Sequence, residues 1–302
     1  MTENAVTIQN VNKSYGSVQA VRDLDLQVPR GSLVGFLGPN GAGKSTTIRM
    51  IMSIIYPDHG RIEVLNATAL QAKDRIGYLP EERGLYRKMR INQFLRYVAR
   101  LKGLRKHDAD ERIQLWLERL ELPDVLNRRC EELSKGQQQK LQFIAAVLHE
   151  PELIILDEPF SGLDPVNAAL LGTTIRELNE QGRTIIFSTH VLHQAEQLCD
   201  RVFLINKGIK LLDDPLEVIH ERYNPKVLTI ELMDPRQQEI PDFTGIRDIS
   251  RDDERFDLHL ENEVDIQSLM STITSSISLR SIELRRPTLD DIFVDLVGGK
   301  NS

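Results

Sequence analysis

An eight-residue stretch near the N-terminus carries the strongest chemical signal in the chain. It reads Gly38-Pro-Asn-Gly-Ala-Gly-Lys-Ser45, and it lies between an apolar run that ends at Leu37 and a helix-like stretch from Thr46 through Ile55. This is the pattern G-x-x-x-x-G-K-[ST], in which backbone N–H groups cradle phosphates, the lysine neutralises the β/γ end of a nucleotide and the hydroxyl binds Mg²⁺. The residues expected at the nucleotide are Gly38, Pro39, Asn40, Gly41, Ala42, Gly43, Lys44, Ser45 and Thr46.

Two adjacent carboxylates follow another apolar run. The segment Leu153-Ile-Ile-Leu156 reads as a buried strand, and Asp157 and Glu158 come directly after it. A carboxylate at a strand end beside a phosphate loop holds the Mg²⁺ shell in P-loop enzymes, so we expect Asp157 to be a metal ligand. Its neighbour Glu158 is then placed to act as general base or to orient an attacking water.

A third strand-like run, Thr184-Ile-Ile-Phe187, leads to His190. His190 and His193 stand at helical spacing with Glu196 nearby, which suggests a metal site, but no further ligands converge on them. We instead expect His190 to lie near the γ-phosphate as a donor. The two cysteines form no C-x-x-C pair, so the sequence signals neither a zinc site nor a disulfide framework.

The stretch "ELSKGQQQKLQF", residues 132–143, opens a helix with polar residues and a glycine in its first turn. Ser134 followed by Gln137 fits a capping box, in which each side chain satisfies an unpaired backbone N–H. The alternative is that the helix start stays open for an anion, because exposed N–H groups and the helix dipole both favour one. Taken by themselves, these residues favour the capping box.

The order of elements predicts two domains. Continuous apolar strands that alternate with helices, from residue 1 to about 223, indicate an α/β fold with a mainly parallel sheet covered on both faces. This domain begins with short antiparallel strands at Val6–Ile8 and Leu24–Val28, and a helical subdomain spans about 90–135. Helical spacing in that subdomain puts two sets of apolar residues each on one helix face: Phe94, Leu95, Val98 and Leu101, and Ile113, Trp116, Leu117 and Leu120. Residues 224–302 read as a small α+β unit without a nucleotide motif. Its predicted strands are Lys226–Leu232, Phe256–Leu260 and Ile277–Leu284, with a helix at Val264–Ile273.

Composition limits the possible functions. A net charge of −7 over 302 residues argues against a protein whose main task is coating nucleic acid. The N-terminus has no secretory signal, and the longest apolar runs fall far short of the roughly 20 residues that span a bilayer. The basic residues between 96 and 106 could face a membrane or partner, although a solvated helix face is the favoured interpretation.

Five motifs in order resemble the ATP-binding subunit of an ABC (ATP-binding cassette) transporter, over residues 1 to about 223. They are the phosphate loop, the signature "LSKGQ" at 133–137, "LIILDEP" at 153–159, "SGLDP" at 161–165 and "STH" ending at His190. The resemblance implies a P-loop NTPase cassette that binds ATP and Mg²⁺ and hydrolyses ATP with Glu158 and His190.

The resemblance also implies how further residues are used. The signature helix would bind the γ-phosphate of ATP held by a second subunit, so that Ser134 and Gly136, with Gln137 beside them, act in trans. Tyr15 would stack on adenine, Asp164 would communicate across the dimer, and the loop Gly77–Arg83 would couple to a membrane partner.

Two positions depart from the family pattern. Lys135 stands where the signature usually has glycine, which adds positive charge near the phosphates. Glu81 stands where the coupling loop usually has a glutamine that touches Mg²⁺ and the attacking water. A carboxylate there can still bind Mg²⁺, and it adds negative charge next to Asp157, Glu158 and ATP.

The leading hypothesis is therefore an ATPase subunit that pairs head-to-tail with a second cassette, a homodimer in the simplest case. It would drive a separate membrane permease, for export, from the cytoplasmic face of the cell membrane, with no nucleic acid as partner. One alternative is a soluble cassette protein acting on ribosomes or DNA, and another is a small-molecule kinase. The tail "RRPTLDDIFVDLVG", residues 285–298, resembles the extra domain of some exporter-type bacterial members, for which we expect a role in dimer contact or regulation.

Overall fold

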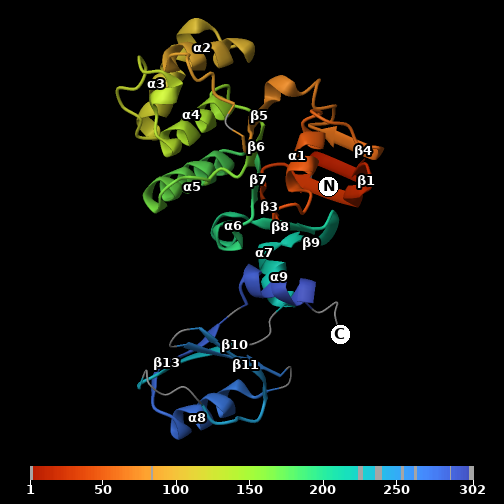
Figure 1. Cartoon of the computed structure of the whole chain (residues 1–302), viewed down its shortest axis with the longest axis vertical. Coiled ribbons are helices and arrows are strands. Elements are labelled where there is room, and N and C mark those ends of the chain that lie inside the picture. The colour runs from red at the N-terminus through yellow and green to blue at the C-terminus, as the bar shows by residue number, and fades with distance from the viewer. Residues whose placement is uncertain are drawn as a thin grey trace. The chain divides into compact units, whose positions relative to one another are not determined.

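The computed structural model describes residues 3–82, 84–223, 227–234, 240–252, 255–261, 264–285 and 287–298. These residues form two compact units, Met1–Leu216 and Glu217–Ser302 (Figure 1). The sequence placed the boundary after Tyr223, whereas the units divide after Leu216, the first residue of the short helix that precedes Tyr223. Among the described residues no helix is long and apolar enough to cross a membrane.

A six-stranded sheet forms the centre of the first unit, in the order β5-β6-β7-β3-β8-β9. The strands from β5 to β8 pair in parallel, and only β9 is antiparallel to its neighbour β8. The sequence-based expectation of a mainly parallel sheet is therefore confirmed. The bounds are β3 Leu33–Leu37, β5 Ile76–Leu79, β6 Leu153–Asp157, β7 Thr184–Thr189, β8 Arg201–Asn206 and β9 Ile209–Pro215.

A second, antiparallel sheet has the order β2-β1-β4, with β1 Asn4–Tyr15, β2 Val18–Pro29 and β4 His59–Val64. The first two strands are much longer than the short pieces predicted at Val6–Ile8 and Leu24–Val28. Register shifts along the hairpin interrupt the alternation of apolar and polar residues, because an extra residue in one strand moves later side chains to the other face. The periodicity therefore marked only part of each strand.

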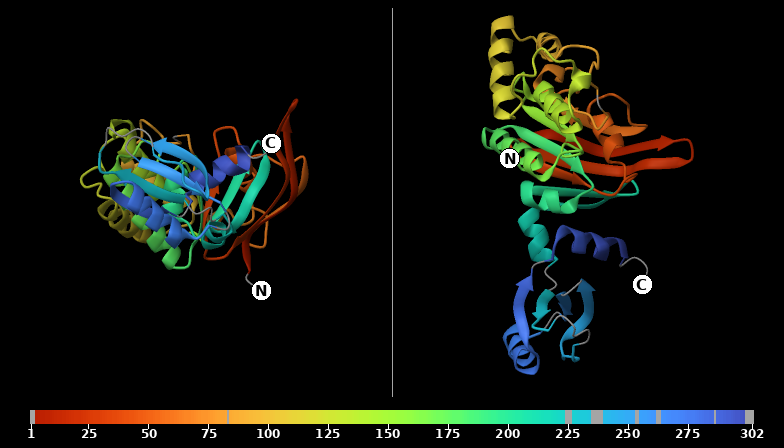
Figure 2. Two further views of the ribbon diagram at one scale, coloured as in Figure 1. Left: turned by 90° about the horizontal axis from the view of Figure 1, so that it is seen from below. Right: turned by 60° about the vertical axis from the view of Figure 1, so that its left-hand side comes forward.

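Helices cover the central sheet on both sides. Figures 1 and 2 show α4, α5 and α6 on one side of it, and α1 with the red β1–β2 hairpin on the other. The helix bounds in this unit are α1 Lys44–Ile51, α2 Ile91–Leu101, α3 Lys106–Arg119, α4 Lys135–Val147, α5 Pro165–Glu180 and α6 Leu192–Leu198. The next helix, α7 Leu216–Arg222, begins at the last residue of this unit. Helix α1 ends earlier than the predicted Ile55, because Ser53 has a left-handed φ of 54°.

The main core lies between the two sheets, around α1. Alternate residues of the central strands, such as Phe36 and Phe203, pack there against Ile48 and Ile51 of α1. The Phe36 and Phe203 rings stack with centroids 4.7 Å apart. Each large apolar side chain buried in this way contributes roughly 1.5–3 kcal/mol, so the phosphate loop, which joins β3 to α1, is anchored at both ends by the core.

The helical subdomain consists of α2, α3 and the start of α4. The face predicted on α3 is confirmed, since Ile113, Trp116, Leu117 and Leu120 are all buried. On α2 the prediction is wrong for Leu101, which is 63% exposed. The apolar spacing of α2 extends past its buried residues to Leu101, which lines a surface groove described below.

The second unit has a four-stranded antiparallel sheet in the order β11-β12-β10-β13. Helix α8 packs on one face through Leu269 and Ile273, against Leu228 and Phe256 of the sheet. The predicted α+β character is confirmed, although strand β11 was not predicted, and Lys226 and Arg286 of the predicted segments lie outside the described residues. The bounds are β10 Val227–Leu232, β11 Ile246–Asp252, β12 Arg255–Leu260, α8 Ile266–Ser276, β13 Leu279–Arg285 and α9 Leu289–Gly298.

Candidate functional site

The phosphate loop turns sharply between β3 and α1, and two of its glycines are required by the geometry. Gly38 has a φ of 151°, and a Cβ atom there would lie 2.2 Å from the carbonyl oxygen of Ile205. Gly43 has a φ of 109°, and a Cβ atom there would lie 2.6 Å from the carbonyl oxygen of Ala20. Neither position accommodates a side chain without movement of backbone, so the loop conformation depends on these glycines.

Lys44 lies beneath this loop with only 6% of its surface exposed. Its Nζ donates to the carbonyl oxygens of Gly38 at 2.6 Å and Pro39 at 3.2 Å. Burial lowers the pKa of Lys44, while the nearby carboxylates of Glu158, Asp157 and Glu81 oppose this shift. The lysine is thus held at the loop as a cation among acidic groups.

Asp157 ends strand β6 and is buried, with 2% of its surface exposed. The hydroxyl of Ser188, on the neighbouring strand β7, donates to its Oδ1 atom. Burial raises the pKa of Asp157, and Glu81 and Glu158 add to this, whereas hydrogen bonds from Ser188 and Ser45 act in the opposite direction. A buried carboxylate with a raised pKa is stabilised by a cation beside it, which the predicted role as a metal ligand requires.

Glu158 is held in an unusual backbone conformation, with a left-handed φ of 52°. Its N–H lies 3.2 Å from both the carbonyl oxygen and the hydroxyl of Ser188. The Oε1 atom lies 2.9 Å from Nδ1 of His190, so the two predicted catalytic residues contact each other. Left-handed non-glycine residues cost about 1–3 kcal/mol and cluster at functional sites, which marks this strand end as a candidate catalytic centre.

The loop and Glu158 line a cavity of about 310 Å³, called here the phosphate-loop cavity. Its oxygen donors suit Mg²⁺, which prefers hard oxygen ligands and usually binds through one or two carboxylates plus phosphates. No group of three or more His, Cys, Asp or Glu able to hold a metal occurs among the described residues. The lining residues are Ala20, Asn40, Gly41, Ala42, Gly43, Lys44, Ser45, Thr46, Glu81 and Glu158.

The structure brings Glu81 into this cavity, together with Glu158 and Lys44. Glu81 is exposed, and only Pro80 separates it from the end of strand β5. The departure from the family pattern noted in the sequence therefore adds a carboxylate within the electrostatic reach of Asp157 and Lys44.

The signature residues at the start of α4 form the predicted capping box. The Oγ atom of Ser134 accepts from the N–H of Gln137 at 3.2 Å, and the Gln137 Oε1 atom accepts from the N–H of Ser134 at 3.0 Å. The next two N–H groups, of Lys135 and Gly136, have no acceptor among the described residues. Capping and an open anion-binding turn are therefore both present at this helix start.

A second cavity of about 550 Å³, called here the signature cavity, opens at this helix start. It contains four of the predicted residues, Ser134, Gly136, Gln137 and Asp164. Of the described residues, none lines both cavities. The full lining is Glu121, Leu122, Ser134, Lys135, Gly136, Gln137, Lys140, Gly162, Asp164 and Asn167.

For two of the predicted residues, Asp164 and Tyr15, the structure gives less direct support for the predicted role. Asp164 caps helix α5, since its Oδ1 accepts from the N–H of Asn167 at 2.9 Å, and this bond holds the pKa of Asp164 below its usual range. Tyr15 ends strand β1 and is 51% exposed. It is not among the residues that line the phosphate-loop cavity, so its role at adenine stays a prediction.

Sequence reasoning missed a link between the signature helix and the catalytic strand end. Gln139 on α4 is only 4% exposed, and its Nε2 donates to the carbonyl oxygens of Glu158 at 3.3 Å and Pro159 at 3.0 Å. A polar residue inside a polar run gives no sign of burial. These hydrogen bonds join α4 directly to the backbone at Glu158, the predicted general base.

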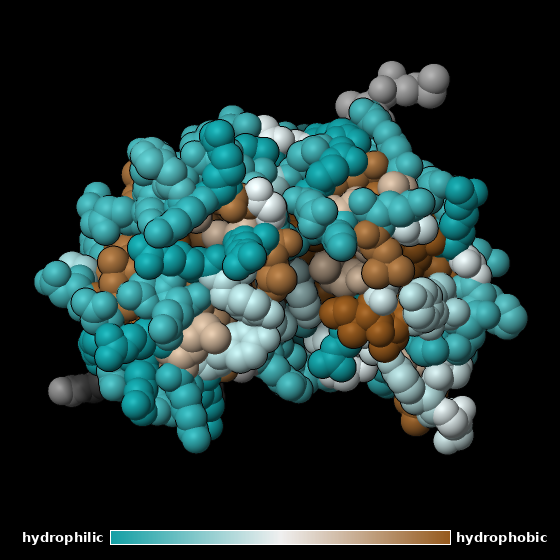
Figure 3. All heavy atoms as spheres, turned by 90° about the horizontal axis from the view of Figure 1, so that it is seen from above, coloured by the Kyte–Doolittle hydropathy of each residue, from teal (hydrophilic) through white to brown (hydrophobic). Residues whose placement is uncertain are grey.

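A surface groove lies between helix faces in the helical part of the molecule. Phe94, Tyr97, Val98 and Leu101 form one wall, at the i, i+3, i+4, i+7 spacing of one face of α2. The opposite wall comes from α4 and from His149, which follows that helix. Tyr78 and Pro80 of the predicted coupling loop also line the groove. Arg83 of that loop is outside the described residues. Figure 3 shows apolar side chains gathered among polar ones on the face at this end of the molecule.

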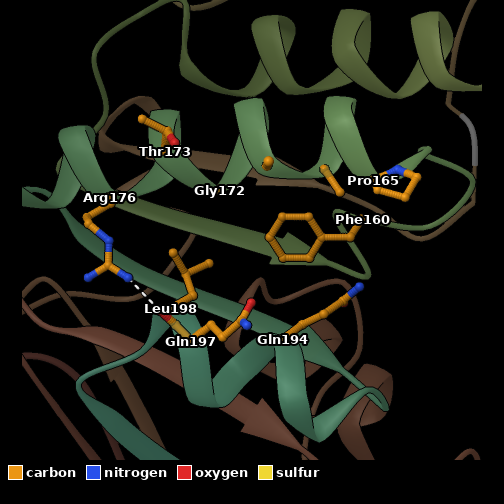
Figure 4. A pocket seen from close by; sticks show the side chains of 10 residues that line it. Phe160, Pro165, Gly172, Thr173, Arg176, Gln194, Gln197 and Leu198 are labelled. Carbon is orange, nitrogen blue, oxygen red and sulfur yellow. Dashed lines mark hydrogen bonds between the residues drawn. The ribbon is translucent and has the colours of Figure 1, made fainter.

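Another cavity, of about 410 Å³, lies between α5 and α6 (Figure 4). Phe160 and Leu198 give it an apolar lining, and Arg176 at its rim donates to the carbonyl oxygen of Gln197 at 2.6 Å. It brings together none of the residues predicted from the sequence.

Comparison with known proteins extends over both units. A family model described as "ABC transporter" matches residues 21–161. A second, described as the C-terminal domain of DrrA1-3-like ATP-binding proteins, matches residues 215–297. The two resemblances inferred from the motifs and from the tail are therefore confirmed.

Individual relatives match along almost the whole chain. The uncharacterised ABC transporter ATP-binding protein YhaQ of Bacillus subtilis is 41% identical over 294 residues, 97% of this chain and 98% of the relative. The daunorubicin resistance ATP-binding protein DrrA3 of Streptomyces coeruleorubidus is 30% identical, over 99% of this chain and 97% of the relative. A solved ATP-binding subunit of an ABC transporter superimposes with a TM-score of 0.68 at 30% identity, covering 72% of this chain and 93% of that chain.

Proposed function

Because the chain belongs to the family of ABC transporter ATP-binding proteins, we propose that it is the ATP-hydrolysing subunit of such a transporter. Two copies close head-to-tail around two ATP molecules and drive a separate membrane permease from the inner face of the cell membrane. Among its relatives are DrrA3, whose name states daunorubicin resistance, and a Nod factor export protein of Bradyrhizobium diazoefficiens, which supports export as the direction.

One observation carries this proposal: two phosphate-binding features lie in separate cavities of the same chain. The phosphate-loop cavity has the lysine and the acidic groups for a nucleotide and its metal, whereas the signature cavity has a helix start with free N–H groups. Since no described residue is shared, each chain supplies half of a site. A head-to-tail pair brings each phosphate loop opposite the other chain's signature helix, and ATP then links the two chains.

The residues of this chain perform distinct tasks in that site. Lys44 neutralises the phosphates, and Glu158 accepts the proton of the attacking water while His190, 2.9 Å away, holds the carboxylate in place. Bound through Ser45, Asp157 and Glu81, Mg²⁺ would neutralise charge that develops on the phosphates. Gln139 carries any shift of the signature helix to the backbone of Glu158.

The groove between α2 and α4 is the proposed contact for the permease. Its exposed aromatic residues include Tyr86 and Tyr97, whose ring centroids lie 5.7 Å apart in an edge-to-face arrangement. Apolar and aromatic side chains at helical spacing suit an amphipathic helix of a partner. Gly77, where a Cβ atom would lie 2.2 Å from the carbonyl oxygen of Ala146, packs the coupling strand tightly against α4.

Glu81 is proposed to alter the response to Mg²⁺. It adds a carboxylate to the phosphate-loop cavity, so it strengthens the demand for a divalent cation before ATP can bind. Titration of Mg²⁺ into the Glu81→Gln variant with ATP tests this, and an unchanged midpoint and unchanged turnover would count against it. For the second unit we propose a role in dimer contact or regulation, which a deletion after Tyr223 would test through dimerisation and turnover.

The overall proposal is tested by trapping the complex. The tagged Glu158→Gln variant is incubated with ATP in detergent-solubilised membranes, and proteins that co-purify are identified by mass spectrometry. A multi-spanning membrane protein that is recovered with ATP, and lost in the Lys44→Ala control, supports the transporter. Ribosomal proteins or DNA, with no membrane protein, would overturn it in favour of a soluble cassette ATPase.

A further inference from the structure

Two lysines in the signature cavity make no hydrogen bond or ion pair with the residues that the structure describes. Lys135 is the first residue of α4, is exposed, and lines the cavity beside Ser134 and Gly136. Its ammonium makes no hydrogen bond or ion pair with any residue that the structure describes. At the first helical position its charge adds to the positive end of the helix dipole.

The second lysine, Lys140, is buried, with 4% of its surface exposed, yet it also lines this cavity. It too has no hydrogen bond or ion pair with the described residues. Burial lowers the pKa of Lys140, and the charges of Glu121 and Asp164 oppose this without contacting it. An unpaired buried ammonium costs free energy unless an anion approaches, so the cavity is prepared for a negatively charged group.

The free N–H groups point to the same chemistry. The capping box uses the N–H groups of Ser134 and Gln137, and it leaves those of Lys135 and Gly136 without acceptors among the described residues. Of the two carboxylates that line the cavity, Asp164 is engaged by the N–H of Asn167. Two cations and two free donors therefore line this cavity together with two carboxylates, and neither carboxylate forms an ion pair with either lysine among the described residues.

We propose that Lys135 is a phosphate ligand in trans: its ammonium binds the terminal phosphate of the nucleoside triphosphate held in the phosphate loop of a second copy of this chain. Lys140 supports it by making the cavity electropositive from below. This inference rests on the proposed head-to-tail pairing. It assigns to Lys135 the part that a cationic finger plays in other P-loop enzymes, where a second protein supplies the charge.

The test measures ATP-driven dimerisation in the Glu158→Gln background, by sedimentation or light scattering, because hydrolysis does not then deplete the dimer. The Lys135→Gly variant is compared with Lys106→Gly as a matched control. Lys106 is an exposed lysine at the first position of α3 and lines neither cavity. Binding of ATP to the separated monomer is measured in parallel.

The expected result is that Lys135→Gly weakens the dimer at least about tenfold, since each dimer loses two charge-assisted contacts. Lys135→Arg should retain the dimer, Lys106→Gly should match the parent, and affinity of the monomer for ATP should not change. The parent dimer should also lose stability more steeply with added salt than Lys135→Gly does. Equal dimerisation of the Lys135→Gly and Lys106→Gly variants would overturn the inference while the pairing itself stands. Failure of the parent to dimerise with ATP would overturn both.

A variant of Lys140 supplies a readout that a merely structural residue would not give. Lys140→Met removes a buried unpaired charge, so the monomer should melt at a higher temperature while the ATP-bound dimer becomes weaker. A lower melting temperature with an unchanged dimer would assign Lys140 to the fold alone and would remove its supporting part from the inference.

Discussion

The phosphate-loop cavity and the signature cavity are both proposed to bind phosphate, and they differ in how completely one chain builds them. In the first, Lys44 is anchored by two carbonyl oxygens and surrounded by carboxylates. In the second, Lys135 and Lys140 have no counter-charge in contact among the described residues. The charges of the first cavity are compensated within the chain, whereas on our proposal those of the second are compensated only when an anion from a second copy binds.

The glycines differ in the same way. Gly38 is required by its own fold, because a Cβ atom there would overlap the carbonyl oxygen of Ile205. At Gly136 a Cβ atom would meet its nearest neighbour, the Cδ2 atom of Leu163, at 3.4 Å, which is close to ordinary contact. Within the chain a side chain would thus be tolerated at Gly136, so the reason for a glycine lies in what approaches from outside.

The largest expected effect is a loss of ATP hydrolysis in a variant in which both cavities still form. Glu158→Gln removes the general base, and turnover of ATP should fall roughly 10²–10⁴-fold. Affinity for ATP should remain, because the lysine and the loop are unchanged. Phosphate release and nucleotide binding measured on the same preparation check this. Turnover within a few-fold of the parent would exclude Glu158 as the base.

Two variants, each with a substitution in only one of the two cavities, should be inactive alone and should regain ATPase activity when they are mixed. Lys44→Ala should weaken ATP binding to the monomer about 30-fold or more, as expected when one partner of a buried charged contact is removed. Gly136→Asp places a like charge against the incoming phosphate and should abolish the dimer without affecting monomer binding. An acidic residue in the first turn of a helix does not disturb its folding.

The mixture of these two variants is the sharper experiment. A heterodimer contains one site made of an intact phosphate loop from the Gly136→Asp chain and an intact signature helix from the Lys44→Ala chain. Partial ATPase activity should therefore appear on mixing, although each variant alone is inactive. An inactive mixture of two well-folded variants would contradict the head-to-tail arrangement.

The two cavities were also unequally predictable from sequence. Local motifs identified Lys44, Asp157 and Glu158, since a short loop or strand end fixes such residues by itself. The bond from Ser188 to Asp157 and the bonds from Gln139 to the backbone at Glu158 join distant segments, so no spacing could have revealed them. Burial of a polar side chain is decided by packing.

The same reason explains what was missed in the fold. The parallel sheet was predicted because its strands are continuously apolar, whereas β1 and β2 were shortened by their register shifts. Leu101 fits the apolar period of α2 but is exposed, because the period serves the groove as well as the core. Lys140 sits within a polar run, and only the structure shows that it is buried and unpaired.

Alanine at the two glycines should separate folding from assembly. Gly38→Ala should lower the free energy of unfolding by about 2–4 kcal/mol, because backbone must move to relieve the overlap. Gly136→Ala should leave it unchanged or raise it by up to about 1 kcal/mol, since alanine is the better helix former. Denaturant melts of the monomers measure both, and ATP-driven dimerisation should be lost in Gly136→Ala. Equal destabilisation by the two substitutions would mean that both cavities serve the fold alike.

The smallest effect concerns a residue in neither cavity, and it sets the background for pH studies of both. His149 lines the groove, and burial lowers its pKa to about 4, helped by Lys102 and Arg112 and opposed by the bond to the Ile76 carbonyl oxygen and by Asp74. The ordinary value is 6.5, so between pH 6.5 and pH 4 the unfolded chain binds a proton that the folded chain does not.

Stability should therefore fall as the pH decreases through this window, by about 2 kcal/mol at pH 5 relative to neutral pH. His149→Gln keeps a donor for the carbonyl oxygen of Ile76 and should remove this part of the acid sensitivity, as measured by denaturant melts at pH 7.5 and pH 5. If the variant and the parent lose stability equally, acid acts elsewhere, and the carboxylates of the phosphate-loop cavity become the place to look. If His149→Gln keeps its stability at pH 5, any loss of dimerisation that acid still causes in this variant is assigned to the two cavities. Acid-induced unfolding through His149 no longer contributes to it.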